Sequence, residues 1–508
     1  MKKTERNIVE DVIYKAIKKN EMNGDSFIPV QDLISKCCSM EKSITWETFV
    51  LGIEKMVEEK EICIENSNVY SAKTYQYEIA AALSLRDILE RNVNTAKWAF
   101  PFPDYYLSDL CEEQKEAVRT ALSHKMSLIT GGAGTGKTTL IKAIIGCWGR
   151  TSSTVLCAPT GKAARNLTDK IGFRARTVHS ALGLRPDEDF LTPVKWSDVS
   201  LIVVDEASML TLEMMAGILQ RARKNCCIVL IGDPNQLQSV GCGNIMNDLL
   251  LLGVPHVHLE LNHRQDEGAA ALLENITNFS KLSKLKTMNG DESLRINLCE
   301  KEDAYDALVQ EASRAYYNGE NIQVITPFKE KTKFSAKSLN DGIKAMVNPH
   351  RVGERVLHLY GMDFHDGDRV MITQNSAEHD CTNGDIGILR LPDKSSEVDF
   401  YIELADGRCP QWGRNEAPIE LIHAYALTVH KSQGSEYDRV LMPVTEEFAC
   451  MMDRNLVYTA ISRARKQVVF YGSDVPLDEA MGKPMRRRLS NLPRRVKAYA
   501  QFAEPEVV

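Results

Sequence analysis

Residues 128–139 read LITGGAGTGKTT, an apolar segment that runs into a glycine-rich loop and then into helical spacing at residues 140–145. The loop matches the pattern G-x-x-x-x-G-K-[ST]. In such a loop the glycines let successive backbone N–H groups surround phosphates, and Lys137 can reach the β- and γ-phosphates. Because a strand before the loop and a helix after it are both expected, the sequence predicts a nucleoside triphosphate site rather than an ordinary glycine-rich turn. The predicted phosphate-binding residues are Gly131, Gly132, Ala133, Gly134, Thr135, Gly136, Lys137, Thr138 and Thr139.

Two acids follow the next apolar run. Leu201–Val204 are all aliphatic and lead directly into Asp205 and Glu206, which predicts a buried parallel strand with carboxylates at its C-terminal end. We expect Thr138 and Asp205 to hold Mg²⁺, and Glu206 to orient or deprotonate the water that attacks the γ-phosphate. Acids at a strand end can also be solvated loop residues, and it is the preceding phosphate loop that favours an ATPase site.

A third apolar run, at residues 226–231, ends in Gly232-Asp233-Pro234-Asn235-Gln236. It predicts a further strand, which would place Gln236 where it can sense the γ-phosphate. Four other segments follow a recognisable order along the chain: APTGKAA at 158–164, TVHS at 177–180, LTVHKSQGSE at 427–436 and VYTAISRAR at 457–465.

In their order and their residues, these segments resemble the motifs of the RecD-like DNA helicases of superfamily 1, the branch that moves 5′ to 3′ on single strands. The resemblance covers roughly residues 97 to 475. It implies an α/β fold of two RecA-like lobes that uses ATP and Mg²⁺, with an SH3-like β-barrel insertion in the second lobe. Single-stranded and tailed duplex DNA would be the partners of a motor that acts as a monomer.

The resemblance also implies roles for individual residues. Gln114 would read the adenine edge, Gln433 and Gly434 would belong to the nucleotide site, and Arg264 and Arg463 would stabilise charge on the transferring phosphoryl group. An arginine in that role typically contributes ~10³ to 10⁵ in rate. Both arginines lie far along the chain from the phosphate loop, so they would come from a second lobe that closes over ATP. Outside this context, a surface ion pair is the better interpretation of Arg264 or Arg465 alone.

Small hydroxyls, backbone amides and a lysine in the segments quoted above resemble the strand-contacting residues of the family. Such groups suit phosphate and sugar contacts, which carry no sequence information. A helix N-terminus with a packed histidine is the alternative for residues 177–179, and Ser180-Ala181 departs from the family pattern there. The predicted DNA contacts are Pro159, Thr160, Lys162, Thr177, His179, Thr428, His430 and Ser432.

Composition and charge restrict the classes of protein to which this chain can belong. A chain of 508 residues with 44% apolar residues can bury several cores, and a net charge of −7 leaves DNA binding to a local groove rather than a global basic surface. The 13 cysteines include no C-x-x-C pair, which argues against a structural zinc or iron–sulfur site and for a reducing compartment. No apolar run approaches ~18 residues, so we expect a soluble, cytoplasmic protein without a membrane partner.

Helical spacing followed by a hairpin pattern at Ile62–Ile64 and Asn68–Tyr70 predicts a winged-helix-like N-terminal domain. Its many glutamates leave docking of a protein partner, a structural role or DNA binding open. From Gly367 to about Glu420, short alternating runs such as residues 398–404, separated by Asp-Gly and Asn-Gly turns, predict strands of a small barrel. The predicted domains are 1–95 (winged-helix-like), 96–262 (first lobe, with a pin-like insertion or plain loop near 185–195), 263–355 with 421–480 (second lobe), 356–420 (SH3-like insertion) and 481–508 (basic tail). We expect this tail to be solvated, with contact of its arginines to phosphate as the alternative.

The sequence therefore predicts an ATP-dependent DNA helicase that moves 5′ to 3′ and unwinds duplex in repair, recombination or related DNA metabolism. Two alternatives stay open. One is a nucleic-acid-stimulated ATPase subunit of a larger complex, and the other is an RNA remodeller. No nuclease or relaxase constellation accompanies the motor, so we do not expect strand cleavage.

Overall fold

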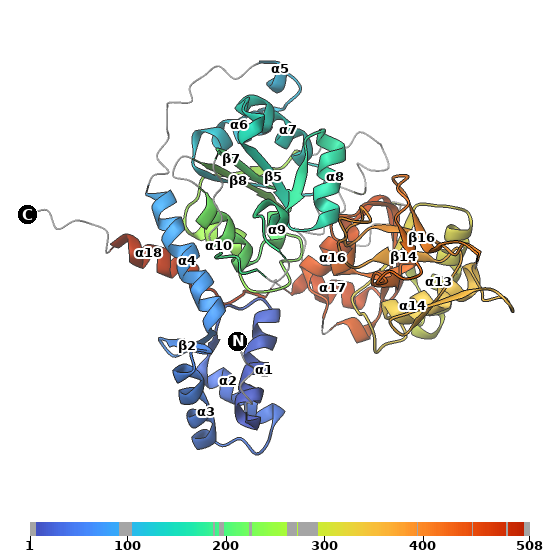
Figure 1. The fold of residues 1–508 in the computed structure, drawn as a ribbon, viewed down its shortest axis with the longest axis horizontal. Helices are drawn as coiled ribbons and strands as arrows, with labels where there is room; N and C mark the ends of the chain where they lie inside the picture. The colour runs from blue at the N-terminus through green and yellow to red at the C-terminus, as the bar shows by residue number, and fades with distance from the viewer. Residues whose placement is uncertain are drawn as a thin grey trace, which may run out of the picture.

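The computed structural model describes residues 7–90, 104–185, 188–192, 198–222, 226–261, 272, 293–393, 395–449, 451–483 and 486–501. Figure 1 shows three parts: a small N-terminal module in blue, a first lobe in cyan to green above it, and a second lobe with its insertion in yellow to orange beside the first. Across the described ranges, none of the helices is both long and apolar enough to span a bilayer.

The N-terminal module consists of three helices and a three-stranded antiparallel sheet of order β1-β3-β2. Capping boxes at Asn7 and Thr45 start its first and third helices. The predicted hairpin is present as β2 and β3, and the sequence of elements is that of a winged helix. The elements are α1 (Ile8–Met22), β1 (Ile28–Pro29), α2 (Val30–Met40), α3 (Trp46–Glu58), β2 (Ile62–Glu65) and β3 (Asn68–Ser71).

The first lobe is a six-stranded parallel sheet of order β6-β5-β7-β8-β4-β9. Along β7, Ile202 and Val204 enter one core while Leu201 and Val203 enter another, so both faces of the sheet are covered. Its elements are α5 (Asp104–Leu107), α6 (Glu112–Ser123), β4 (Met126–Gly131), α7 (Lys137–Trp148), η2 (Thr151–Ser153), β5 (Thr154–Ala158), α8 (Gly161–Ile171), β6 (Ala175–Thr177), α9 (Val178–Ala181), β7 (Leu201–Val204), η3 (Ala207–Met209), α10 (Leu212–Arg221), β8 (Cys227–Gly232), α11 (Ile245–Leu251) and β9 (His256–Leu259).

The strands of this sheet run parallel, so their carboxyl ends meet at one edge. The phosphate loop, the acids after β7 and the loop after β8 therefore converge there, as the apolar runs predicted. One helix, α4 (Ala72–Leu89), links the N-terminal module to the lobe and packs against α10. The segment expected to form a pin is described only in part. Its residues 188–192 form no strand, and Phe190 is buried in the core of the lobe.

The second lobe is a five-stranded parallel sheet of order β10-β21-β20-β11-β19, also covered on both faces. The two parallel sheets confirm the predicted pair of RecA-like lobes. The elements are β10 (Leu294–Leu298), α13 (Lys301–Tyr317), β11 (Ile322–Thr326), α14 (Ala336–Val347), β19 (Ala426–Thr428), α15 (Val429–Ser432), β20 (Tyr437–Val444), η4 (Glu446–Phe448), α16 (Arg454–Ile461), β21 (Ala464–Gly472) and α17 (Val475–Gly482).

The insertion in the second lobe is antiparallel, with a sheet of order β17-β16-β15-β14-β18 and a separate hairpin of β12 and β13. It has its own core, in which Trp412 stacks on Phe400 with ring centroids 4.9 Å apart. The predicted strand over residues 398–404 is present. Its classification as SH3-like stays a prediction. The elements are β12 (Val356–Leu359), β13 (Met362–His365), β14 (Arg369–Ile372), β15 (Ile386–Arg390), β16 (Val398–Leu404), β17 (Gln411–Gly413) and β18 (Leu421–His423).

The chain after residue 485 differs from the expected solvated tail. Residues 486–501 return to the first lobe and end in α18 (Leu492–Gln501), which packs against α4. Within it, Arg495 is 6% exposed and its Nε donates to Glu78 Oε1 at 2.7 Å. The prediction of a solvated tail is wrong for these residues because the acids that pair with Arg495 lie some 400 positions earlier, at Glu65 and Glu78.

Candidate nucleotide and nucleic-acid sites

The phosphate loop connects β4 to the N-terminus of α7. Gly134 and Gly136 adopt φ values of 82° and 77°, a region that glycine enters without steric cost. Lys137 lies across the loop, and its Nζ donates to the carbonyls of Gly131 and Gly132 at 2.7 Å each. The loop amides and the lysine therefore surround one point at the positive end of α7, which suits an anionic phosphate.

Asp205 and Glu206 follow β7 at the same edge of the sheet. Desolvation raises the pKa of Asp205 to about 7, the Glu206 charge adds to this shift, and the Lys137 charge opposes it. Within the described residues, Asp205 Oδ1 is buried without a hydrogen-bond partner. Glu206 has φ 52°, an uncommon value for a residue other than glycine, and such strain is concentrated at functional positions.

A cleft of about 820 Å³, here called the P-loop cleft, contains residues from both lobes. The second lobe contributes Arg463, which is 5% exposed and whose Nε donates to Thr459 O at 3.1 Å. Arg463 has no carboxylate partner in the described part of the chain, whereas Arg465 pairs with Glu436 at 2.8 Å. An unneutralised guanidinium therefore lines the same cleft as the phosphate loop. The other lining residues include Ala133, Gly134, Thr135, Gly136, Lys137, Thr138, Thr139, Asp205, Glu206, Gln236 and Gly434.

The two lobes meet through polar residues of α16 that the sequence interpretation missed. Asn455 Nδ2 donates to Asn235 O at 2.9 Å, and Thr459 Oγ1 accepts from the backbone N–H of Leu237 at 2.7 Å. Tyr458 Oη donates to Asp233 Oδ2 at 2.8 Å, and burial together with this carboxylate raises the pKa of Tyr458. The i, i+3, i+4 spacing places these three polar residues on one face of a largely apolar helix, and this was the available signal.

Other predicted nucleotide-site residues lie close by but not in the P-loop cleft. Gln114 is buried, and its Nε2 donates to Thr135 O at 3.3 Å, behind the loop. Gln433 Nε2 donates to Leu237 O at 3.3 Å, at the junction of the lobes. Arg264 lies outside the described residues.

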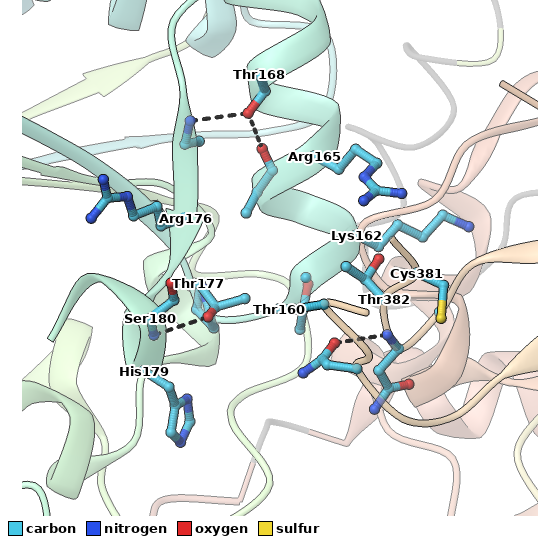
Figure 2. A pocket seen from close by; sticks show the side chains of 18 of the residues that line it. Thr160, Lys162, Arg165, Thr168, Arg176, Thr177, His179, Ser180, Cys381 and Thr382 are labelled. Atoms are coloured by element: carbon cyan, nitrogen blue, oxygen red, sulfur yellow. Dashed lines mark hydrogen bonds between the residues drawn. The ribbon is translucent and has the colours of Figure 1, made fainter. Parts of the chain in front are cut away.

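A second cavity of about 1630 Å³, here called the interlobe groove, lies between the first lobe, α15 and the insertion. In Figure 2, Thr177 and His179 lie on one side of Thr160, and Lys162 and Thr382 lie on the other. Of the predicted DNA contacts, those that line the groove are Pro159, Thr160, Lys162, Thr177, His179 and His430. Further lining residues that were not predicted include Arg174, Arg176, Asn375, Thr382, Asn383 and Lys431.

The groove is electrostatically unusual at Lys162. Desolvation lowers the pKa of this ammonium to about 8, an effect that Asp385 only partly opposes. Desolvation and the charge of Arg488 lower the pKa of His430. A phosphate in the groove would favour the charged form of both groups.

Four predicted contacts also have structural roles. Thr177 caps α9, and His179 packs against Phe190 with ring centroids 4.9 Å apart, so the packed-histidine alternative describes part of its environment. Thr428 caps α15, and the fully buried Ser432 Oγ donates to Val429 O at 2.8 Å. Thr428 and Ser432 are not among the residues that line the groove.

Two family models match the chain: an AAA domain over residues 109–296 and a UvrD-like helicase C-terminal domain over residues 423–471. The ATP-dependent RecD2 DNA helicase of Deinococcus radiodurans is 32% identical over 399 residues, which are 77% of this chain and 53% of that protein. This chain thus spans about half the length of that relative. Bacteroides Pif1 bound to single-stranded DNA is 20% identical, covers 72% of this chain and 93% of that one, and has a TM-score of 0.48.

A second relative matches over most of both chains. The RecBCD enzyme subunit RecD of Mycolicibacterium smegmatis is 30% identical over 411 residues, which are 73% of this chain and 72% of that protein. This chain thus covers more than two thirds of that relative. The chain belongs to the RecD-like family of superfamily 1 DNA helicases.

Proposed function

We propose that the protein is an ATP-dependent DNA helicase that moves 5′ to 3′ on single-stranded DNA and unwinds duplex, in DNA repair or recombination. One observation carries this proposal: Arg463 of the second lobe and Lys137 of the first line a single cleft. Closure of the lobes on ATP would bring the guanidinium onto the transferring phosphoryl group, and opening would follow hydrolysis. ATP hydrolysis and movement of the lobes would thereby be coupled.

The residues of the P-loop cleft fit ATP with Mg²⁺. The unpartnered Asp205 Oδ1 and the Thr138 hydroxyl would hold the ion, which when bound would neutralise charge on the phosphates. Lys137 neutralises the β- and γ-phosphate oxygens, Glu206 orients the attacking water and accepts its proton, and Arg463 stabilises charge that develops in the transition state.

The interlobe groove suits a single strand read without regard to sequence. Its lining combines hydroxyls, amides and lysines, which contact phosphate and sugar rather than base edges. The hydrogen bond from Gln433 to Leu237 O lies between the groove and the P-loop cleft. Through it, a change in the bound nucleotide would alter how tightly the groove holds the strand.

The proposal is tested by measuring ATPase activity with matched DNA and RNA oligonucleotides over a salt series. We expect single-stranded DNA to stimulate turnover, and the stimulation to weaken with salt because each phosphate contact releases counterions. Equal stimulation by RNA would support an RNA remodeller instead. Stimulation without unwinding of any tailed duplex would support an ATPase subunit that works within a larger complex.

Glu206→Gln separates binding from hydrolysis. The amide keeps the shape of the carboxylate but is a far weaker base, so we expect turnover to be abolished while ATP and the strand stay bound together. Lys137→Ala is the matched comparison, because it removes a phosphate contact and should weaken ATP binding as well. Equilibrium binding of a fluorescent ATP analogue, measured beside steady-state hydrolysis, distinguishes the two. Wild-type hydrolysis in Glu206→Gln would show that another group acts as the base.

A further inference from the structure

Residues 486–491, here called the C-terminal strap, follow the second lobe in the chain and lie against both the first lobe and the N-terminal module. The backbone of Leu489 pairs with the module, accepting from the Ser26 N–H at 2.8 Å and donating to Asp25 Oδ1 at 2.9 Å. Ser490 Oγ donates to Asp248 Oδ2 in the first lobe at 2.7 Å. The strap therefore joins three parts of the molecule.

Arg488 is the centre of this junction. Its Nη1 donates to Ser239 Oγ at 3.0 Å, to Gly241 O at 3.1 Å and to Gly243 O at 2.9 Å, and Nη2 donates to Ser239 O. Burial lowers the pKa of Arg488 to about 10, and Asp25 opposes this shift. A planar guanidinium with several fixed donors can hold a loop by its carbonyls, whereas a lysine ammonium cannot match that geometry.

The N-terminal module packs against the same arginine through Gly24. Gly24 has φ 97°, and a Cβ at this position would lie 2.1 Å from Arg488 Nε. Its carbonyl accepts from the Gly243 N–H at 2.9 Å. The absence of a side chain at Gly24 therefore lets the module, the arginine and residues 239–243 pack as one unit.

Residues 239–243 come shortly after Leu237, which forms hydrogen bonds with the second lobe. Leu237, two positions before Ser239, donates its N–H to Thr459 Oγ1 and accepts from Gln433 Nε2, both in the second lobe. Gln236 lines the P-loop cleft immediately before it. A shift of the second lobe that displaces Leu237 is therefore transmitted within a few residues to the oxygens held by Arg488.

We propose that Arg488 is a positioning residue that couples the nucleotide state of the P-loop cleft to the N-terminal module. The coupling rests on the proposed function, since it requires that nucleotide binding moves the lobes. By fixing residues 239–243 to the strap and to Gly24, Arg488 makes the module respond to movements that begin at Gln236 and Leu237. The module then reports, or is driven by, each cycle of the motor.

Hydrogen–deuterium exchange with and without a non-hydrolysable ATP analogue tests this coupling. In the wild type we expect the analogue to change exchange at residues 132–139 and also at residues 20–27 of the module. Arg488→Met should keep the first response and lose most of the second, and Arg488→Lys should show an intermediate response. Arg487→Met is the control, because Arg487 is exposed on the same strap and should behave as the wild type.

Gly24→Ala provides an independent disruption from the opposite side of the joint with Arg488 intact, and it should also lose the response at 20–27. Thermal unfolding establishes that each variant is folded. A nucleotide response at 20–27 that persists in both Arg488→Met and Gly24→Ala overturns the coupling. So does a wild type that responds at 132–139 but not at 20–27. A wild type without any response at 132–139 overturns the proposed function, and the coupling with it.

Discussion

Arg463 shows how a single residue completes a site built mainly by the other lobe. Its guanidinium lines the P-loop cleft without a carboxylate partner in the described part of the chain, so its charge is available to a phosphoryl group. We expect Arg463→Ala to lower the ATP turnover rate by about 10³ to 10⁵ while KM changes little, because the interaction strengthens mainly in the transition state. Steady-state hydrolysis with saturating single-stranded DNA measures both constants.

Arg465→Ala is the control for that experiment, since Arg465 lines the same cleft but is paired with Glu436. It should retain turnover within a few-fold of the wild type. Near-normal hydrolysis by Arg463→Ala would transfer the role to Arg264 or Arg465.

Asp248 gives the protein a pH-dependent stability. Burial raises the pKa of this carboxyl to about 7 from an ordinary value of 3.8. The folded state therefore holds a proton that the unfolded state releases, so this contribution to stability falls as pH rises from about 4 to about 7 and is flat above that. Asp248→Asn stays neutral and can still accept from Ser490. The free energy of unfolding of the variant minus that of the wild type should therefore increase by roughly 1–3 kcal/mol from pH 5 to pH 8.

Denaturant unfolding at the two pH values measures this difference. Asp11→Asn is the comparison, because the Asp11 side chain is 44% exposed and pairs with its helical neighbour Lys15. An Asp248→Asn curve parallel to that of the wild type would show that Asp248 is ionised throughout.

Local pattern could predict some of these residues and not others. Lys137 and Glu206 were placed correctly relative to their strands because a strand end fixes the direction of the next few residues. Ser432 was expected to contact DNA, yet its side chain turns inward to a carbonyl of its own helix, a choice set by packing around α15. Asn455 and Thr459 were missed because their partners are backbone groups of the other lobe.

At the scale of elements, α8 and the insertion face each other at one end of the interlobe groove. Arg165 donates to Asp385 at 3.2 Å and to Asp380 at 3.1 Å, and Arg408 also donates to Asp385 at 3.1 Å. A Cβ on Gly161 would lie 2.8 Å from Thr382 Cβ, so glycine is needed for this approach. The ion pairs thus hold a wall of the groove contributed by the insertion against the wall contributed by α8.

Loss of this contact should weaken retention of the strand. We expect Arg165→Gln to dissociate from single-stranded DNA about 5-fold faster, which corresponds to ~1 kcal/mol for a partly exposed ion pair. Stopped-flow dissociation into excess unlabelled competitor measures the rate. Lys170→Gln on the same helix is the control, because its pair with Glu436 lies at the P-loop cleft. An unchanged rate for Arg165→Gln would mean that the insertion holds the strand without this contact.

The sequence could predict elements whose signal is local. The aliphatic run of β7 and the alternating pattern of β16 were both identified, since burial on two faces or one leaves a distinct pattern. Helix α18 was not, because Arg494 and Arg495 made the segment resemble a basic tail and its apolar face consists of only a few side chains, Leu492, Val496 and the partly buried Tyr499. The acids that neutralise Arg495 belong to the N-terminal module and α4, and no local pattern can indicate them.

For the whole molecule, the two parallel sheets were predictable but their arrangement was not. A glycine-rich loop after an aliphatic strand predicts a nucleotide-binding lobe, and the chain contains that signal in its first lobe. The second lobe was expected from the resemblance to RecD-like helicases. The position of the N-terminal module depends on Arg486 and Arg495, whose contacts with Asp25 and Glu78 span more than 400 positions in sequence. The module is thus attached to the motor by the strap and α18 as well as by the covalent path through α4.

The direction of movement is a property of the whole molecule and cannot be read from the ATP site. Lys137, Glu206 and Arg463 would perform the same chemistry in either direction, because hydrolysis only alternates the lobes between open and closed. Direction depends on which lobe holds the strand more tightly in each state, and we expect that contact to lie in the interlobe groove, which Asn383 and His430 line. The expected direction rests on the resemblance to RecD-like helicases. We therefore expect a duplex with a 5′ single-stranded tail to be unwound and the same duplex with only a 3′ tail to remain intact. A fluorescence-quenched strand-separation assay with an identical duplex in both substrates measures this. Unwinding confined to the 3′-tailed substrate would reverse the assigned polarity and leave the ATPase argument standing, since none of its residues determines direction.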